Sequence, residues 1–108
     1  MKKLLASTCL TLGLLTMASA ASAADCGSVT IASMSWQSAE VMSNVDKIIL
    51  EKGYGCNADI IVGDTVPTIT SMVEKGQPDV APEAWIDLLP EVVDRGMKEG
   101  KIVTAATS

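Results

Sequence analysis

Short β-rich runs alternate along this chain with longer segments in which apolar residues recur every three or four positions. The β-rich runs cover residues 29–32, 57–62, 79–81 and 101–105. The segments between them carry apolar stripes made of Val41, Val45, Ile48 and Ile49, of Ile69, Met72 and Val73, and of Val92, Val93 and Met97. Such stripes are typical of helices that cover a sheet. The order β-α-β-α-β-α-β therefore predicts an α/β fold, in which right-handed crossovers join the strands of a parallel sheet with flanking helices.

Polar and special residues mark where these helices begin and end. Ser38 is a good N-cap for the first helix, and Glu40 puts a negative charge in its first turn, where the helix dipole favours it. Gly53 is expected to end that helix. Pro67 and Pro90 fall in the expected first turns of the second and third helices, where proline is well tolerated.

The first 23 residues have the three parts of a cleaved secretion signal. Lys2 and Lys3 are positively charged, residues 4–17 are predominantly apolar, and residues 21–23 form an Ala-Ser-Ala cleavage site. The apolar stretch is short for a membrane span, so an uncleaved signal anchor is the less favoured alternative. We expect a mature domain that starts at Ala24 and is exported to the periplasm.

Length and charge narrow the classes of function. The 85 residues from Ala24 onward suffice for one small domain. The chain carries 8 basic and 13 acidic residues, a net charge of −5, which becomes −7 without Lys2 and Lys3. An acidic chain without a basic patch argues against binding to nucleic acid or to anionic membrane surfaces. The same charge is compatible with cationic or zwitterionic ligands.

Two cysteines, Cys26 and Cys56, lie beyond the signal segment, and each comes just before one of the first two β-rich runs. Two neighbouring parallel strands would bring these positions together, so an oxidising compartment favours a disulfide between them. Closing a loop of about 30 residues stabilises a fold by roughly 3–4 kcal/mol in the chain-entropy model. A redox or metal site is the alternative, but the chain has neither a C-x-x-C motif nor a histidine.

Trp36 and Trp85 are two of only three aromatic residues, and each lies where a β-rich run gives way to a helical segment. In an open α/β sheet such junctions face one crevice, in which ligands bind. Two indole faces in one crevice suit a quaternary ammonium group, because this cation has no N–H to donate and must be held by ring faces. The alternative is that the indoles are core packing. We expect both residues to bind the ligand.

The same crevice offers groups for an anion. The helix that begins at Ser38 has free backbone N–H groups at its start, which hold a carboxylate well, and the Thr65 hydroxyl lies at the start of the next helix. Plain N-capping is the alternative role for both side chains. Together with the two indoles, these groups fit a betaine-like zwitterion. Glu83, near the crevice, is also expected to contact the ligand.

Catalysis has few candidates in this sequence. The chain contains no histidine, which excludes a histidine-based triad or metal site within it. Asp64, Asp79 and Glu83 lie near the proposed crevice, where a carboxylate pair could act as acid and base, but nothing in their spacing requires this. We therefore expect a binding protein with no catalytic residue, metal or cofactor. The alternatives are a small secreted α/β enzyme and an interaction domain.

These features together resemble a known family, the periplasmic substrate-binding proteins of ABC importers for glycine betaine, proline betaine and choline. The resemblance extends from about Cys26 to Ala105, and it depends on the order and spacing of several segments more than on any one of them. Those segments are Val-Thr-Ile-Ala at 29–32, Trp-Gln-Ser-Ala-Glu at 36–40, Ile-Leu-Glu-Lys-Gly-Tyr at 49–54, Gly-Asp-Thr-Val-Pro at 63–67 and Asp-Val-Ala-Pro-Glu-Ala-Trp at 79–85.

The resemblance implies a two-lobed (type II) periplasmic binding protein that closes on its ligand. It also implies an aromatic cage around the quaternary ammonium, to which Trp36 and Trp85 would contribute from the first lobe. The implied partners are an ABC permease and the ATPase behind it. The charge and the short apolar stretch described above add the expectations of no nucleic acid partner and no membrane span in the chain itself. Family members are longer and have a second lobe, so residues 24–108 are expected to form a partial lobe that binds ligand weakly alone.

Overall fold

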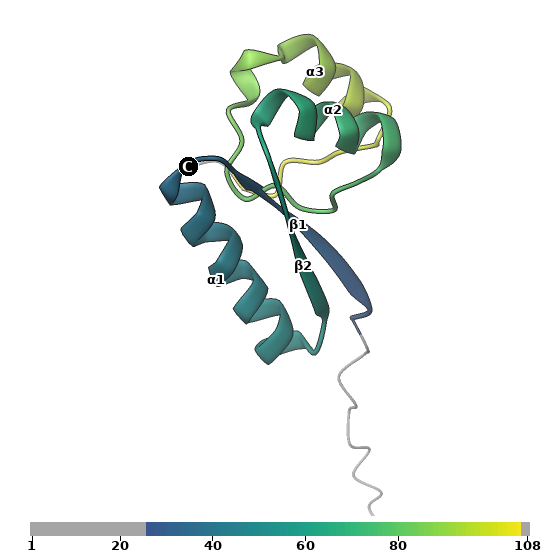
Figure 1. The fold of residues 1–108 in the computed structure, drawn as a ribbon. Helices are drawn as coiled ribbons and strands as arrows, with labels where there is room; N and C mark the ends of the chain where they lie inside the picture. Colours follow the sequence, from purple (N-terminus) through teal and green to yellow (C-terminus); the bar gives the residue numbers. More distant parts are fainter. Residues whose placement is uncertain (1–25, 107–108) are drawn as a thin grey trace, which may run out of the picture.

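The computed structural model describes residues 26–106, which form a short parallel sheet with helices beside it (Figure 1). The elements are β1 (Ser28–Met34), α1 (Gln37–Tyr54), β2 (Asn57–Gly63), α2 (Thr65–Lys75), the 3₁₀ helix η1 (Ile86–Leu88) and α3 (Pro90–Lys98). The predicted α/β fold class is confirmed, and so are the approximate positions of the three helices. The predicted signal segment, residues 1–23, lies outside the described residues.

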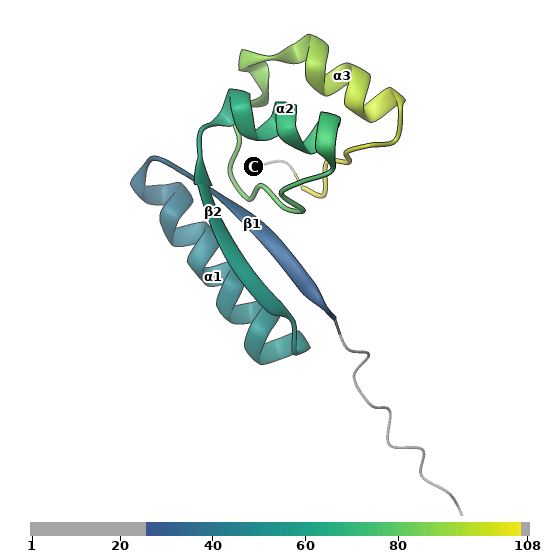
Figure 2. The same cartoon turned by 45° about the vertical axis from the view of Figure 1, so that its right-hand side comes forward.

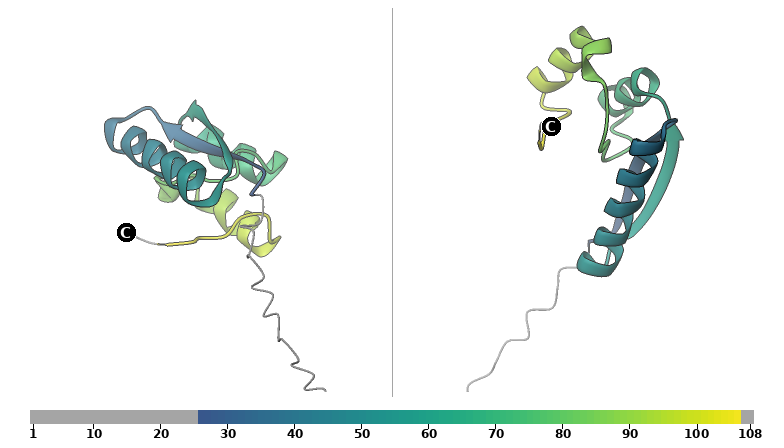
Figure 3. Two further views of the ribbon diagram at one scale, coloured as in Figure 1. Left: turned by 90° about the horizontal axis from the view of Figure 1, so that it is seen from below. Right: turned by 90° about the vertical axis from the view of Figure 1, so that its left-hand side faces the viewer.

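β1 and β2 pair in parallel over their whole length, from Ser28 opposite Asn57 to Met34 opposite Gly63. α1 makes the crossover between them and lies along one side of the two strands (Figure 2). Further views show α2 and α3 gathered beyond the end of the strands at which β2 leads into α2 (Figure 3). The parallel pairing therefore places the two strand-to-helix junctions side by side.

The predicted disulfide joins Cys26 to Cys56, whose Cα atoms are 4.6 Å apart. It lies directly before the two strands, where the Asn57 N–H also donates to the carbonyl of Gly27 over 2.8 Å. The covalent link and the backbone bond together fix the register at the amino ends of β1 and β2.

The two later strands of the prediction do not form as expected. The predicted third strand, residues 79–81, is reduced to a single bridge between Val80 and Ile31, next to β1. The predicted fourth strand, residues 101–105, is wrong, because this segment has no regular structure. Its first two backbone N–H groups, those of Lys101 and Ile102, donate to the carbonyl of Gly96 in α3 and so extend the end of that helix.

The core of the described residues is divided into two small clusters. One contains buried residues from β1 and the start of α1, and the other contains buried residues from α2, α3 and the segment before α3. Their buried members are Ala32, Met34 and Ala39 in the first cluster, and Ile69, Leu89 and Val93 in the second. Ala81 and Ala84 pack against both clusters, so the segment 81–84 links them. The position of this segment depends on both clusters.

The predicted apolar stripe of α1 faces away from the sheet, and the prediction that it would be buried is wrong. Val41, Val45, Ile48 and Ile49 are 47–63% exposed. The buried residues of α1 are instead Ala39 and Ser43. Small side chains let the helix approach the strands closely, and the Ser43 hydroxyl donates to the carbonyl of Glu40 over 3.0 Å, so its burial leaves no donor unpaired.

The other two apolar stripes are closer to the prediction. Ile69 and Val73 of α2 are buried and Met72 is partly buried, while in α3 Val93 is buried but Met97 is 47% exposed. The predicted end of α1 at Gly53 is also corrected, because the helix continues to Tyr54 and the left-handed C-cap is Gly55.

Gly96 of α3 is expected to be intolerant of any side chain. A Cβ at this position would lie 2.6 Å from Cγ2 of Val73 and 3.0 Å from Cγ1 of Ile102. We expect Gly96→Ala to lower the free energy of unfolding by about 1–2 kcal/mol, since overpacking outweighs the gain in helix propensity. Gly53→Ala is the matched control, because a Cβ there meets nothing within 4 Å, and it should stabilise by about 0.5–1 kcal/mol. Urea denaturation of both variants measures this, and equal effects would contradict the close contact.

Candidate functional site

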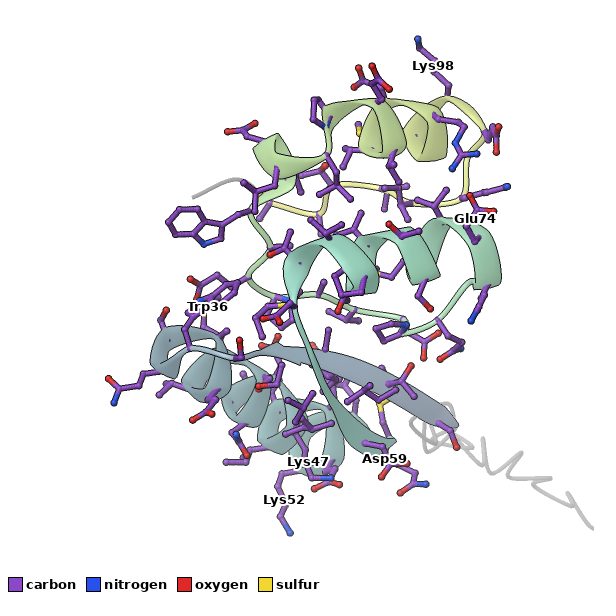
Figure 4. The ribbon with its side chains drawn as sticks, turned by 45° about the horizontal axis from the view of Figure 1, so that its top comes forward. Trp36, Lys47, Lys52, Asp59, Glu74 and Lys98 are labelled. Carbon is purple, nitrogen blue, oxygen red and sulfur yellow. A yellow bond between two sulfur atoms is a disulfide. The ribbon has the colours of Figure 1, made fainter. Side chains whose placement is uncertain are left out.

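Three chain segments meet at the carboxyl ends of the two strands. β1 ends at Met34 and leads through Trp36 into α1, while β2 ends at Gly63 and leads through Asp64 into α2. The third segment comes from the bridge at Val80. Figure 4 labels Trp36 at the start of α1, on the side that faces the upper group of helices. This is the edge at which open α/β sheets bind ligands.

The structure brings the two tryptophans together at this edge. The ring centroids of Trp36 and Trp85 are 6.3 Å apart and the ring planes make an angle of 74°, an edge-to-face arrangement. Trp36 is partly buried and packs against the cluster of Ala32, Met34 and Ala39. Trp85 is 63% exposed. The two rings therefore form a corner of 74°, in which the Trp36 ring packs against the core and the Trp85 ring is largely exposed.

A pocket of about 420 Å³ lies at this corner. Its lining residues come from the β1–α1 junction, the start of α2 and the segment around η1, and they are Trp36, Asp64, Thr65, Val66, Pro67, Trp85 and Leu88. Most of them are apolar, and Asp64 provides the only charged side chain among them. The volume suits a small organic molecule, and the mixture of apolar walls with one or two polar groups is typical of such sites.

Glu83 is bonded to Trp36 and is not among the residues that line the pocket. One carboxylate oxygen, Oε1, accepts hydrogen bonds from the Trp36 indole Nε1–H over 2.8 Å and from the Ser38 hydroxyl over 3.0 Å. The other oxygen, Oε2, is buried and has no hydrogen-bond partner within the described residues. The contacts of the Glu83 side chain are therefore with other candidate site residues.

Ser38 and Thr65 both use their side chains to hold other parts of the site. The prediction of Ser38 as the N-cap of α1 is wrong, because Trp36 occupies that position and the Ser38 hydroxyl is bonded to Glu83. Thr65, 3% exposed, accepts a hydrogen bond from the backbone N–H of Trp85 over 3.3 Å. The N-cap of α2 is Asp64.

Asp79 fastens the segment that carries Trp85 to the sheet. Its Oδ2 accepts the backbone N–H of Thr30 over 2.8 Å and lies 2.8 Å from the Thr30 hydroxyl. The amide of Gln77 donates to Oδ1 over 3.2 Å. These bonds, first that of the Thr30 backbone N–H, hold the pKa of the Asp79 carboxyl below its ordinary value of 3.8.

Each of the three carboxylates named as acid–base candidates accepts a hydrogen bond from a different partner. Asp79 is bonded to Thr30, Glu83 to Trp36, and Asp64 accepts the Ser35 hydroxyl over 2.5 Å.

Within residues 26–106, no group of three or more histidine, cysteine or acidic side chains is placed to hold a metal ion. In the same part of the chain, no helix is long and apolar enough to cross a membrane.

Sequence reasoning missed Val66, Pro67 and Leu88 as lining residues of the pocket. Val66 and Pro67 directly follow Thr65. The sequence therefore predicted that the start of α2 lines the site, but only one of the lining residues of that helix was named. Leu88 lies three positions after Trp85, and a helical turn between them would have placed both on one face.

The two tryptophans are expected to differ in their effect on stability. Trp36→Ala removes partly buried packing and leaves the Glu83 carboxylate without its indole donor, so we expect a loss of about 2–3 kcal/mol in the free energy of unfolding. Trp85→Ala should cost less than about 1 kcal/mol, because the side chain is largely exposed. Leu88→Ala, at the same 63% exposure, is the control for Trp85→Ala. Equal losses for both tryptophans, measured by urea denaturation, would contradict this difference.

The Asp79 contacts predict a component of acid sensitivity. Since the pKa of the folded state lies below the unfolded value of 3.8, Asp79 contributes stability above that value and loses it as the pH falls through the lowered pKa. We expect Asp79→Asn to be less stable than the parent chain at about pH 6 and to show a smaller further loss on acidification. Thr30→Val removes the hydroxyl alone, so its stability at about pH 6 should lie between that of Asp79→Asn and that of the parent chain. Urea unfolding curves at about pH 6 and at a pH below 3.8 provide the test. The same change in stability between the two pH values for all three proteins would refute the prediction.

Comparison with protein-family models gives a match that spans nearly all of the described domain. Residues 27–108 match the model described as the substrate binding domain of the ABC-type glycine betaine transport system. The matched range contains every strand and helix of the described residues and the whole lining of the pocket. A comparison with curated proteins found no match.

Proposed function

The chain belongs to the family of substrate-binding domains of ABC-type glycine betaine transport systems, and we propose that its pocket binds the cationic head of a quaternary ammonium solute between Trp36 and Trp85. The family is one of transport proteins, and its substrate-binding domains present a small molecule to a membrane permease.

The observation that carries the proposal is the corner made by the two indoles in the wall of the pocket. A quaternary ammonium ion has no N–H, so polar acceptors cannot hold it as they hold a primary amine or a sugar hydroxyl. Ring faces attract it through their quadrupole, and two rings at 74° offer contact from two directions. The Asp64 carboxylate in the lining adds further attraction for a cation.

The anionic end of a betaine would meet the start of α2. Thr65 and Val66 lie in the pocket lining, and the backbone N–H groups of a first helical turn have no partner within the helix. Helix α1, whose start at Ser38 was the expected anion site, contributes only Trp36, its N-cap, to the lining. Glycine betaine, proline betaine and choline share the cationic head that the proposal concerns.

The exposure of Trp85 supports a site with one wall in this domain and a second wall elsewhere. A cation–π contact contributes roughly 0.5–1 kcal/mol when exposed and about 2 kcal/mol when desolvated. Two exposed contacts total roughly 1–2 kcal/mol, below an association cost of at least about 4 kcal/mol. Binding by this wall alone therefore also needs the attraction of Asp64 and of the start of α2, and it should be no tighter than millimolar. We propose that a second lobe covers the ligand, as in two-lobed binding proteins.

We propose that the domain acts in the periplasm together with a membrane transporter. Residues 1–23 would direct export and be removed, which places the domain (residues 24–108) in the periplasm. The Cys26–Cys56 disulfide is consistent with an oxidising compartment. The partners would be an ABC permease and the ATPase behind it.

Titration with choline and with 3,3-dimethylbutanol, its uncharged isostere, tests the ligand class. We expect choline and glycine betaine to shift the indole signals of Trp36 and Trp85 in nuclear magnetic resonance spectra, with millimolar dissociation constants. The isostere should bind at least about fivefold more weakly, because it keeps the shape and apolar surface but lacks the charge that the ring faces attract.

Three outcomes would contradict parts of the proposed function. Equal affinity for choline and its isostere would show an apolar pocket without cation recognition. Binding of ordinary amino acids or sugars without a response to quaternary amines would place the ligand in another class. Micromolar binding by a monomer would contradict the need for a second wall.

A further inference from the structure

We propose that Glu83 is a positioning residue of this site: it fixes the Trp36 ring opposite Trp85 and acts on the ligand through that ring. The structural part of this inference is independent of the ligand, whereas its effect on affinity rests on the proposed function. It revises the expectation that Glu83 contacts the ligand directly.

The contacts of Glu83 indicate how the ring is held. Trp36 has one side on the cluster of Ala32, Met34 and Ala39 and also lines the pocket. Packing restrains the tilt of the ring, but the direction of its N–H edge needs a partner. The 2.8 Å bond from Nε1–H to the Glu83 carboxylate supplies one, and a bond to a charged acceptor is stronger than a neutral one.

The charge of Glu83 has no basic partner within the described residues. The ion pairs found there are Lys47–Glu51, Arg95–Glu74 and Lys101–Glu99, and Glu83 takes part in none of them. Its Oε1 receives two donors from the β1–α1 junction, while its Oε2 is buried without a hydrogen bond. A buried carboxylate oxygen without a partner is destabilising, so the two bonds accepted by Oε1 are the contacts that hold the Glu83 carboxylate beside Trp36.

The same short segment sets the positions of both rings. Glu83 bonds to Trp36 through its side chain, and two residues later the backbone N–H of Trp85 donates to Thr65. Ala84, between them, packs against both core clusters. The segment 83–85 therefore holds the Trp36 ring through a side-chain bond and the backbone of Trp85 through its N–H, and so brings the two indoles to the same place.

The hydrogen bond from the Trp36 indole N–H to Glu83 also polarises the π-system of the ring. A carboxylate at Nε1 pushes electron density toward the ring, which increases the negative potential of the face that the cation meets. Glu83 would thus favour a cation over a neutral ligand without touching it, and its absence from the pocket lining agrees with this indirect role.

Two substitutions separate positioning from direct contact. Glu83→Gln keeps an oxygen that accepts the indole N–H but removes the charge, and Glu83→Ala removes both. Because the chain has only two tryptophans, its spectrum has two indole N–H signals, which Trp85→Phe assigns. We expect the Trp36 signal of the whole chain to be downfield and slow to exchange, to remain so in Glu83→Gln, and to move to a solvent-exposed position in Glu83→Ala.

Affinity for tetramethylammonium, a probe with no anionic end, gives the second measurement. We expect Glu83→Gln to stay within about threefold of the parent chain and Glu83→Ala to be weaker by about fivefold or more, as loss of a fixed aromatic contact implies. Glu40→Gln is the matched control for removal of one acid near the start of α1, and it should match the parent. If Glu83→Ala does not fold, Glu83→Met takes its place in the test, because methionine fills the space but does not offer a carboxylate to accept the indole N–H.

The outcomes that overturn the inference are distinct from those that overturn the function. An unchanged Trp36 signal in the variant without an acceptor would refute the positioning role. Equal and large losses of affinity in both variants, with the Trp36 signal retained, would show that Glu83 attracts the ligand by its own charge. If the parent chain binds no quaternary amine, the proposed function fails, while the indole signals still decide whether Glu83 fixes the ring.

Discussion

Parallel pairing of β1 with β2 is the constraint on which the rest of this structure depends. It requires a crossover, which α1 makes, and it brings the carboxyl ends of both strands to the same edge. Trp36 and Thr65 reach the pocket because each follows one of these ends within two residues. The single bridge from Val80 to Ile31 adds the third segment, and with it Trp85. An antiparallel pair would separate these residues by the length of the strands.

Much of this arrangement could be predicted from the sequence, because it follows from local patterns and from topology. Alternation of β-rich and helical segments indicates parallel strands, parallel strands place Cys26 beside Cys56, and the same rule places Trp36 and Trp85 at one edge. Each inference needs the order of the elements and no side-chain detail. The family resemblance drawn from the same segments is confirmed by the match over residues 27–108.

The rest depended on contacts that a pattern does not contain. Helical spacing shows that α1 has an apolar stripe, but not that Ala39 and Ser43 would be the face against the sheet. A strand needs an open neighbour as well as a β-rich sequence, and the first two residues of the predicted fourth strand, Lys101 and Ile102, bond to Gly96 of α3 instead. Ser38 has the chemistry of an N-cap, yet the Glu83 carboxylate, distant in sequence, is its partner. In each case a tertiary contact outweighed the local preference.

The disulfide and the pocket lie at opposite ends of the same two strands. Cys26 and Cys56 precede the first residues of β1 and β2, while the pocket begins after their last residues, and seven-residue strands separate the two by roughly 20 Å. The bond that secures the strands is therefore remote from the groups that would select a ligand. Substitutions in the pocket lining would therefore leave the disulfide undisturbed, and loss of the disulfide would leave the pocket residues in place. The domain is in this sense divided along its strands into one end whose chemistry depends on the pocket side chains and another whose integrity depends on the redox state of the surroundings.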